Sequence, residues 1–228
     1  MATPKFDPAV LVTEADIFQA ARWKKYPFEY LTETNYTKDE VRAGEPEVIR
    51  LIPKLPHVEL FCKLWQSERL LTVVKSRRML FSWMCSGLEL WLTSFTQEAH
   101  VAVIAQDQSG SEKFLGRVLW LYNHLPPKCP RPEIRLWMGL EGNPKKIMMV
   151  ETGSTIEAFP GIPDKIRGEG KSLVRCEEIA FWPKAAESWA AILPTIQGGG
   201  RVVCISTPLA GSWYQNLVQD TLLASVPN

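Results

Sequence analysis

LLTVVKSRRMLFSW, residues 70–83, joins an apolar run at 70–75 to a segment at 82–95 that is apolar nearly all round. The run predicts a buried strand, and the segment after it predicts a buried helix. The basic residues between them lie where a phosphate-binding loop lies, between a strand and the N-terminus of a helix, where backbone N–H groups attract phosphate oxygens. This stretch therefore favours an α/β fold built around such a loop.

The loop carries the residue types that bind a nucleoside triphosphate. Lys75, Arg77 and Arg78 supply cations for the β and γ phosphates, and the hydroxyl of Ser82 is placed to ligate Mg²⁺. The usual pattern has glycines and a Lys directly before the Ser or Thr, whereas Leu80 and Phe81 stand here. A basic surface loop is the alternative. The predicted ATP-binding residues of the loop are Lys75, Ser76, Arg77, Arg78, Met79, Leu80, Phe81 and Ser82.

Two further strands end in polar residues. The run at 173–178 ends in the acidic pair Glu177 and Glu178, and the run at 202–206 ends in Ser206, Thr207 and Pro208. In a nucleotide hydrolase, Glu177 would hold hydrated Mg²⁺ and Glu178 would orient and deprotonate the attacking water. Ser206 and Thr207 would sense hydrolysis. The alternatives are two solvated glutamates at a turn and a simple strand terminator.

Composition bounds the class of protein. The chain has 228 residues, 46% hydrophobic and 22% charged, with a net charge of +1, so DNA contact would require a local patch or several copies. Five widely spaced cysteines without a CxxC pair argue against a disulfide framework and a zinc site, and favour an intracellular setting. Neither an apolar run of about 18 residues nor a secretion signal is present, so no membrane is expected.

The order of segments predicts the domain organisation. Residues 1–60 are rich in proline, with one helix expected at 14–25, and form an N-terminal appendage to a core at 61–228. Strands are expected at 70–75, 101–105, 147–151, 173–178 and 202–206, and further helices at 112–125 and 185–192. This alternation predicts a mostly parallel central sheet flanked by helices, as in an additional-strand P-loop NTPase. All three polar motifs should then meet at the carboxyl edge of the sheet.

The strings KSRRMLFSW, IRGEG, RCEEIAFWP and CISTPLAGSWY, in this order, resemble the ATPase domain of tailed-bacteriophage large terminase subunits over about residues 60–215. The resemblance implies that Lys75 is a displaced phosphate-loop lysine assisted by Arg77 or Arg78. It implies a trans-acting arginine at Arg167 and an adenine-recognising Gln66. It also implies that Glu177 and Glu178 form the acidic motif, with Glu where Asp is usual, and that Ser206, Thr207 and Pro208 form the coupling motif.

The resemblance further implies an ATPase that uses ATP and Mg²⁺ to move double-stranded DNA into a procapsid in the host cytoplasm. Its implied partners are DNA, a small terminase subunit, a portal protein and other copies of the chain in a ring. The C-terminal nuclease domain of the family is expected to be absent from these residues. Two alternatives remain open: another additional-strand ATPase, such as a helicase-like motor, and a non-catalytic nucleotide-binding module.

Overall fold

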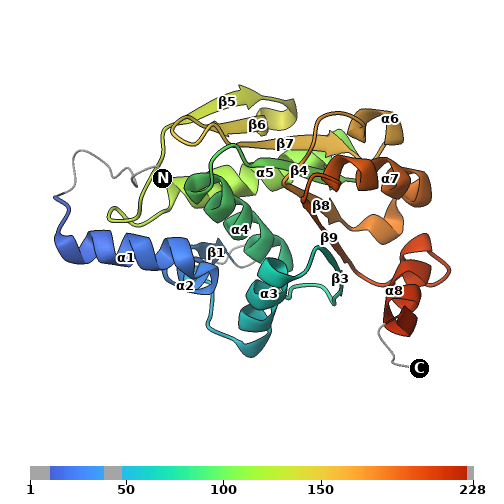
Figure 1. Ribbon diagram of the computed structural model, residues 1–228, viewed down its shortest axis with the longest axis horizontal. Coiled ribbons are helices and arrows are strands. Elements are labelled where there is room, and N and C mark those ends of the chain that lie inside the picture. Colours follow the sequence, from blue (N-terminus) through green and yellow to red (C-terminus); the bar gives the residue numbers. More distant parts are fainter. Residues whose placement is uncertain (1–10, 39–47, 225–228) are drawn as a thin grey trace.

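A computed structural model describes residues 11–38 and 48–224 of the chain. Over these residues the chain forms a seven-stranded sheet in the order β3-β9-β8-β4-β7-β6-β5, together with a small two-stranded sheet, β1-β2 (Figure 1). β9 lies between β3, which leads into the basic loop, and β8, which ends in the acidic pair. This insertion is the additional strand, and the predicted fold class is confirmed.

Five neighbouring strands of the large sheet run parallel: β3, β9, β8, β4 and β7. β6 pairs antiparallel with both β7 and β5. The central strands β4 and β9 are mostly apolar because helices cover both faces of the sheet there. The strands are β1 (Tyr36–Lys38), β2 (Ile49–Leu51), β3 (Leu70–Val74), β4 (His100–Ala105), β5 (Ile134–Met138), β6 (Pro144–Met149), β7 (Thr155–Pro160), β8 (Leu173–Glu177) and β9 (Arg201–Ser206).

Successive residues of the central strands enter two different hydrophobic cores. Val101 and Val103 of β4 face the core that α3, α4 and α5 cover, while Ala102 and Ile104 face the core that α6, α7 and α8 cover. The α-helices are α1 (Glu14–Lys25), α2 (Pro27–Thr34), α3 (Pro56–Ser67), α4 (Phe81–Phe95), α5 (Gln108–Asn123), α6 (Pro163–Ile166), α7 (Ala185–Ile192) and α8 (Trp213–Ala224). Short 3-10 turns lie at Leu140–Gly142, Ile179–Phe181 and Leu193–Ile196.

The expected elements are found with small shifts at their ends. The helix expected at 14–25 is α1, the helix expected at 185–192 is α7, and the helix expected at 112–125 begins earlier, at Gln108. Asp107 explains that earlier start, since its carboxylate caps the helix by accepting a hydrogen bond from the Gly110 N–H at 2.7 Å. The strand expected at 147–151 is β6, but it runs antiparallel to its neighbours. β5 and β7 were not anticipated.

The N-terminal elements pack on the core. Tyr30 and Leu31 of α2 belong to the same apolar cluster as α4, and the indole N–H of Trp91 donates to the carbonyl of Trp23 at 2.8 Å. Gly87 allows the close approach, because a Cβ there would lie 2.5 Å from Leu31 Cδ1. We predicted an appendage at 1–60 and a core at 61–228. In the structure α1 and α2 pack against the helices of that core.

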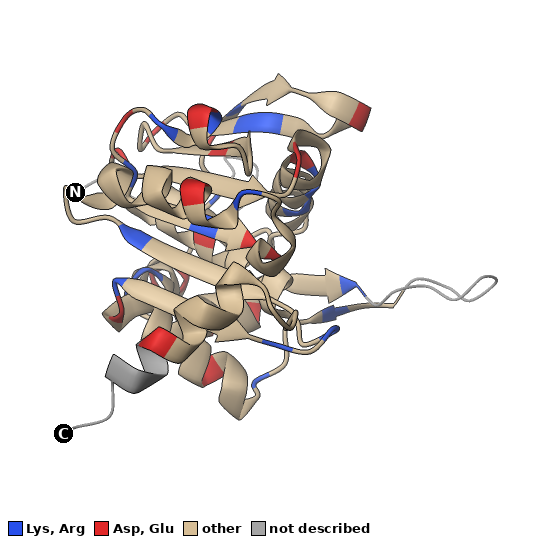
Figure 2. Ribbon diagram, turned by 90° about the vertical axis from the view of Figure 1, so that its right-hand side faces the viewer, with Lys and Arg blue, Asp and Glu red and all other residues tan. Residues whose placement is uncertain are grey.

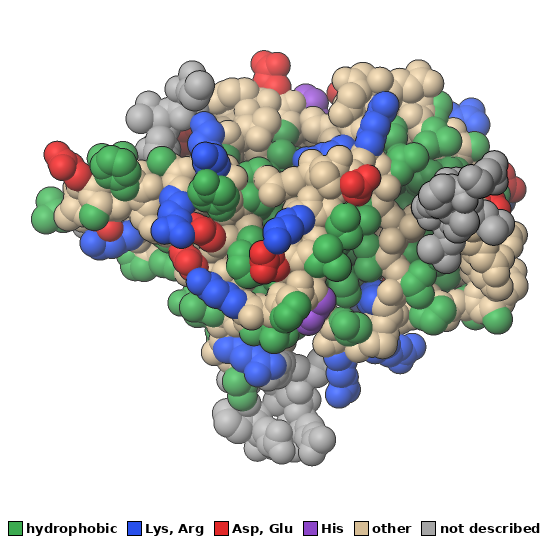
Figure 3. Space-filling model, turned by 60° about the horizontal axis from the view of Figure 1, so that its bottom comes forward, with side chains coloured by type: hydrophobic (Ala, Val, Ile, Leu, Met, Phe, Trp, Pro, Cys, Tyr) green, Lys and Arg blue, Asp and Glu red, His purple; other side chains and the backbone are tan. Residues whose placement is uncertain are grey.

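The surface carries charges of both signs. Lys and Arg are interspersed with Asp and Glu along the ribbon (Figure 2), and on the face shown in Figure 3 hydrophobic side chains alternate with charged ones. The face in Figure 3 carries no continuous basic area, in keeping with the net charge of +1. Within residues 11–38 and 48–224, the helices are too short or too polar to span a bilayer.

Candidate functional site

Strand register brings the three motifs together at the carboxyl edge of the sheet. β9 pairs with β3 on one side and with β8 on the other, so the ends of these strands lie next to one another. Just beyond the ends of these strands, one further backbone hydrogen bond forms on each side of β9. The N–H of Lys75 donates to the carbonyl of Ser206 at 3.1 Å, and the N–H of Glu178 donates to the carbonyl of Ile205 at 2.7 Å. The backbone itself therefore fixes Lys75 and Glu178 on either side of β9.

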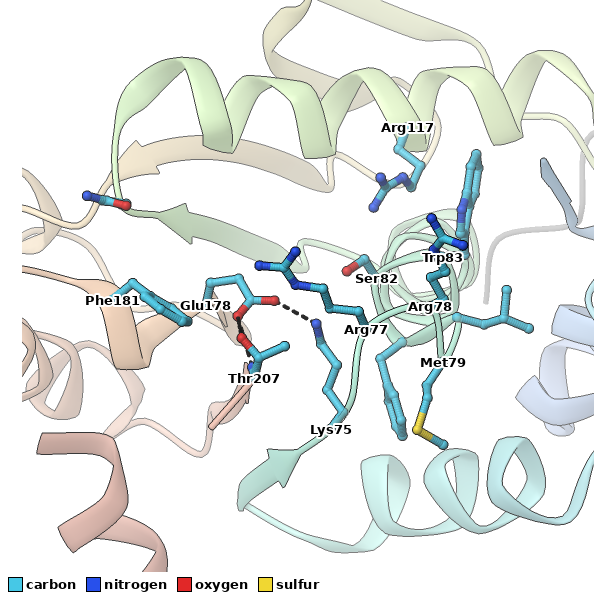
Figure 4. A pocket seen from close by; sticks show the side chains of 13 residues that line it. Lys75, Arg77, Arg78, Met79, Ser82, Trp83, Arg117, Glu178, Phe181 and Thr207 are labelled. Carbon is cyan, nitrogen blue, oxygen red and sulfur yellow. Dashed lines mark hydrogen bonds and ion pairs between the residues drawn. The ribbon is translucent and has the colours of Figure 1, made fainter. Parts of the chain in front are cut away.

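An open pocket of about 600 Å³ lies at this edge, between the basic loop, α5 and the ends of β8 and β9 (Figure 4). Its volume is in the range of sites that hold a cofactor-sized ligand. The lining residues are Lys75, Arg77, Arg78, Met79, Leu80, Phe81, Ser82, Trp83, Gln106, Arg117, Glu178, Phe181 and Thr207.

Lys75, Glu178 and Thr207 form one hydrogen-bonded group (Figure 4). Nζ of Lys75 lies 2.6 Å from Oε1 of Glu178. The other carboxylate oxygen, Oε2, accepts hydrogen bonds from the N–H and the hydroxyl of Thr207, both at 2.9 Å. Burial alone would raise the pKa of Glu178, but the hydrogen bonds from Lys75 and Thr207 outweigh it, and the pKa lies below its ordinary value. Glu178 is therefore a carboxylate at neutral pH.

Three side-chain-bearing residues at this edge have a left-handed backbone. Arg78 has φ 66°, Leu80 has φ 64°, and Glu178 has φ 51°. Glycine usually fills such positions because a Cβ there is strained. Leu80 is the residue that replaces the expected loop glycine, and it retains the glycine-like conformation immediately before α4. The loop thus holds a left-handed turn at Leu80 at the cost of local strain.

Glu177 points to the opposite face of the sheet from its neighbour Cys176, toward α4. Alternation along β8 places Leu173, Arg175 and Glu177 on that face. One carboxylate oxygen of Glu177, Oε2, lies 3.4 Å from the hydroxyl of Ser82. Ser82 and Glu177, predicted to share a metal ion, are therefore brought together.

The other oxygen of Glu177 is held by Arg175. Both Nε and Nη2 of Arg175 donate to Glu177 Oε1, the Nε bond at 2.9 Å. On its far side Arg175 Nη1 donates to the carboxylate of Glu89 at 3.0 Å and to the hydroxyl of Ser86 at 3.1 Å. Ser82, Ser86 and Glu89 are spaced along one face of α4, which allows a single guanidinium from β8 to reach them.

This charged cluster is buried. Arg175, Glu177 and Glu89 each have side chains only 1% exposed. Burial raises the pKa of Glu89 to about 7, since it outweighs the opposing attraction of Arg175. Burial disfavours the charge of Arg175, but the two acids outweigh it and raise the pKa of this group, so it stays a cation. The cluster fixes the orientation of the Glu177 carboxylate from behind and leaves Oε2 facing Ser82.

Other predicted site residues lie outside the pocket. Ser76 is exposed in the loop but does not line the pocket, and Pro208 lies one residue beyond the lining. Ser206 is buried beneath Glu178, where its hydroxyl lies 3.3 Å from Oε2 and accepts from the N–H of Ala180 at 3.2 Å. Arg167 is exposed, in the turn that follows α6, and does not line the pocket.

Gln66 is not brought to the pocket. It is exposed in the last turn of α3, just before β3 begins, whereas the loop follows the end of β3. Gln66 therefore lies toward the opposite edge of the sheet. The end of α3 that lies near the loop is its start, where the rings of His57 and Phe81 are 6.2 Å apart.

Sequence reasoning missed four lining residues: Trp83, Gln106, Arg117 and Phe181. Gln106 follows the end of β4, so the rule that identified Ser206 would have identified it as well. Phe181 lies in the short turn after the acidic pair. Arg117 enters from the middle of α5, and no local pattern marks that position.

Solved structures of bacteriophage large terminases are similar to this chain, although no protein-family model matches it. The HK97 large terminase aligns with a TM-score of 0.64 at 11% identity, over 88% of this chain and 41% of that protein. The ATPase domain of the Thermus phage P74-26 large terminase aligns with a TM-score of 0.51 at 20% identity, over 65% of this chain and 62% of that domain. A large terminase from a thermophilic bacteriophage, in complex with ADP, aligns with a TM-score of 0.51 at 11% identity, over 71% of this chain and 39% of that protein.

At these identities the similarity shows a shared fold. The matched region spans less than two thirds of each of these proteins.

Proposed function

We propose that this chain, which has the fold of bacteriophage large terminases, hydrolyses ATP and drives the packaging of double-stranded DNA. The contact of Lys75 and Thr207 with Glu178 carries the proposal, because it joins the three sequence motifs in one pocket. A phosphate-binding cation, a general base and a residue able to respond to hydrolysis are the parts that phosphoryl transfer requires. The structure of the similar thermophilic-phage terminase in complex with ADP supports nucleotide binding at this fold.

The loop would hold the phosphates. Lys75 and Arg77 point into the pocket (Figure 4), and α4 begins at Phe81, which lines the same pocket. A triphosphate would compete with Glu178 for Lys75, because it carries more negative charge than one carboxylate. Lys75 would then move from Glu178 to the phosphates when ATP binds.

Ser82 and Glu177 would hold Mg²⁺. Their hydroxyl and carboxylate oxygens are hard ligands suited to this ion, and they already lie 3.4 Å apart. When bound, the ion neutralises charge on the β and γ phosphates. Arg175 would keep the Glu177 carboxylate in place during the reaction, since it holds the oxygen that does not face Ser82.

Glu178 would act as the general base. Its low pKa makes it a carboxylate, and release of Lys75 would free Oε1 to accept a proton from a water molecule. That water attacks the γ-phosphorus, the bond to the β,γ-bridging oxygen breaks, and ADP leaves with the bonding electrons. Thr207, which donates two hydrogen bonds to Glu178, would transmit the change to the end of β9 together with Ser206 and Pro208.

Packaging would require several copies of the chain in a ring in the host cytoplasm. A nearly neutral chain can hold DNA when weak basic patches of several copies face one channel. Arg167, exposed and outside the pocket of its own chain, would reach the nucleotide of a neighbouring copy. The small terminase subunit and the portal protein would be the further partners. Residues 61–228 would form the motor core.

Binding of a fluorescent ATP analogue with Mg²⁺ tests the proposal. The native chain should bind, and Lys75→Ala should weaken binding by about tenfold or more, which corresponds to about 1.4 kcal/mol. Lys63→Ala is the matched control, because Lys63 is an exposed lysine of α3 that pairs with Glu59 and does not line the pocket. It should bind as the native chain does.

Each failure has a separate meaning. Absence of binding by the native chain would contradict the proposed site. Binding without phosphate release, even with DNA present, would favour a non-catalytic nucleotide-binding module. Stimulation of phosphate release by single-stranded DNA and not by a portal-bound packaging complex would favour a helicase-like motor.

A further inference from the structure

Arg117 is a cation that the proposed reaction leaves without a role. It projects from α5 toward the pocket, on the side opposite Lys75 (Figure 4). Its guanidinium lies 4.8 Å from the ring centre of Trp83 and 5.3 Å from that of Phe114. Two aromatic rings from different helices therefore fix where this group points, at little further entropic cost when it binds a ligand.

The guanidinium of Arg117 lacks a polar partner among the described residues. No hydrogen bond or ion pair joins Arg117 to any residue within 11–38 and 48–224, and its Nη1 atom is buried. Buried cations are normally paired, because loss of water disfavours their charge. Burial, and then repulsion by Arg175, lower the pKa of Arg117 to about 10, so it remains charged at neutral pH.

The nearby acids are already engaged. Glu177 and Glu89 are close enough to favour the charge of Arg117, yet both are bound by Arg175. The ring of Phe114 also contacts Arg175, whose guanidinium lies 4.7 Å from the ring centre. Arg175 thus takes the hydrogen bonds of both buried acids, while Nη1 of Arg117, beside the pocket, has none.

We propose that Arg117 binds a phosphate group of the nucleotide from the α5 side of the pocket. This inference rests on the proposed nucleotide site. Arginine suits the role because its planar fork donates two parallel hydrogen bonds to phosphate oxygens. A bound phosphate supplies the partner that Nη1 lacks. The loop and α5 then hold the phosphates from two sides, and Arg117 adds a second cation to Lys75, since Phe81 stands where the usual pattern has a lysine.

Arg117→Met separates a binding role from a structural one. Methionine keeps a long side chain between Trp83 and Phe114 and removes the unpaired charge. The nucleotide-free variant should melt at a higher temperature than the native chain, by about 2–4 °C. Its affinity for the fluorescent ATP analogue should fall by about tenfold or more. A residue that only supports the fold would lower the melting temperature.

Two control variants accompany this measurement. Lys113→Met changes an exposed cation on the same helix, one that pairs with Glu141 outside the pocket, and should leave affinity unchanged. Arg117→Lys keeps the charge without the fork and should bind more tightly than Arg117→Met. Competition with ADP identifies the phosphate: weaker ATP binding alone indicates the γ-phosphate, and weaker binding of both nucleotides indicates the α or β phosphate.

Native affinity in Arg117→Met would overturn the inference while the proposed nucleotide site stands. A lower melting temperature together with weaker binding would also overturn it, since Arg117 would then be structural. Absence of binding by the native chain would instead remove the nucleotide site itself, and this inference with it.

Discussion

The ammonium group of Lys75 lies 2.6 Å from Oε1 of Glu178, so the phosphate-binding cation and the general base of the proposed site are paired in the nucleotide-free chain. The lysine side chain is 9% exposed and the glutamate 36%. The pair holds each group in position, but it also prevents each from acting. In the proposed mechanism, nucleotide binding and activation of Glu178 would therefore be linked, because phosphates that attract Lys75 would release the carboxylate.

Glu178→Gln should separate binding from turnover. The amide removes the negative charge that retains Lys75, so affinity for ATP should equal or exceed that of the native chain. The amide cannot accept the proton of the attacking water, so phosphate release should fall by about 10²–10⁴-fold. Binding of the fluorescent analogue and single-turnover phosphate release measure the two effects.

Glu187→Gln is the matched control, because Glu187 is exposed on α7 and does not line the pocket. It should change neither quantity. Native turnover in Glu178→Gln would remove this residue from catalysis, and weaker ATP binding would contradict the competition between Glu178 and phosphate for Lys75.

Thr207→Val should move the acid limb of the pH–rate profile. The hydroxyl of Thr207 donates to Glu178 Oε2 at 2.9 Å and helps to lower the pKa of the carboxylate. Without this bond the pKa rises, so Glu178 becomes protonated at higher pH and hydrolysis should decline earlier on acidification. Thr207→Ser keeps the hydroxyl and should retain the native profile. An acid limb at the same pH in both variants would show that the hydroxyl does not tune the base.

Much of the fold could be predicted from the sequence because its central strands are buried on both faces. Such strands are mostly apolar, as at β4 and β9, and polar residues at the ends of β8 and β9 mark the carboxyl edge. β5 and β7 escaped prediction for the converse reason. β5 is an edge strand with four exposed residues in IRLWM, and β7 interrupts its apolar residues with Glu157 and ends in a proline.

Residues of the candidate site could be predicted where they lie in short motifs of the sequence. They could not be predicted where distant residues meet only through packing. Lys75, Ser82 and Glu178 lie in short strings at strand ends. Arg175 and Glu89 each stand alone among apolar residues, and their pairing depends on β8 lying behind α4. A lone charge in a predicted buried strand and another in a predicted buried helix do carry a signal, because each requires a partner.

Glu89 should make stability depend on pH. Burial raises its pKa from the ordinary 4.5 to about 7, so the folded chain holds this proton more tightly than the unfolded chain does. The contribution of the group to stability is complete below pH 4.5 and is lost as the pH rises through about 7. Each unit of pKa shift corresponds to about 1.4 kcal/mol. Urea denaturation of the native chain and Glu89→Gln, compared at several pH values, measures this loss.

The native chain should lose stability relative to Glu89→Gln as the pH rises, because glutamine does not ionise. Glu59→Gln, at an exposed position on α3, should show no such trend. A native chain that gains stability relative to Glu89→Gln with rising pH would mean that the ion pair with Arg175 outweighs burial.

At position 80, glycine should give a more stable chain than alanine, the reverse of their usual order in a helix. Its φ of 64° places Cβ in a strained position at the start of α4. Leu80→Ala and Leu80→Gly remove the same packing against the core, but only glycine relieves the strain. Leu80→Gly should therefore be more stable than Leu80→Ala by about 1 kcal/mol, measured by urea denaturation.

Ser94, inside the same helix, supplies the reference pair. There the backbone is helical, so Ser94→Ala should be more stable than Ser94→Gly by about 1 kcal/mol. If alanine is also the better residue at position 80, the loop does not hold the left-handed turn in solution. If glycine is better there and Leu80→Gly also binds ATP more tightly than Leu80→Ala, the turn is the conformation in which the loop receives phosphate, and the native leucine maintains it under strain for its contacts with the core.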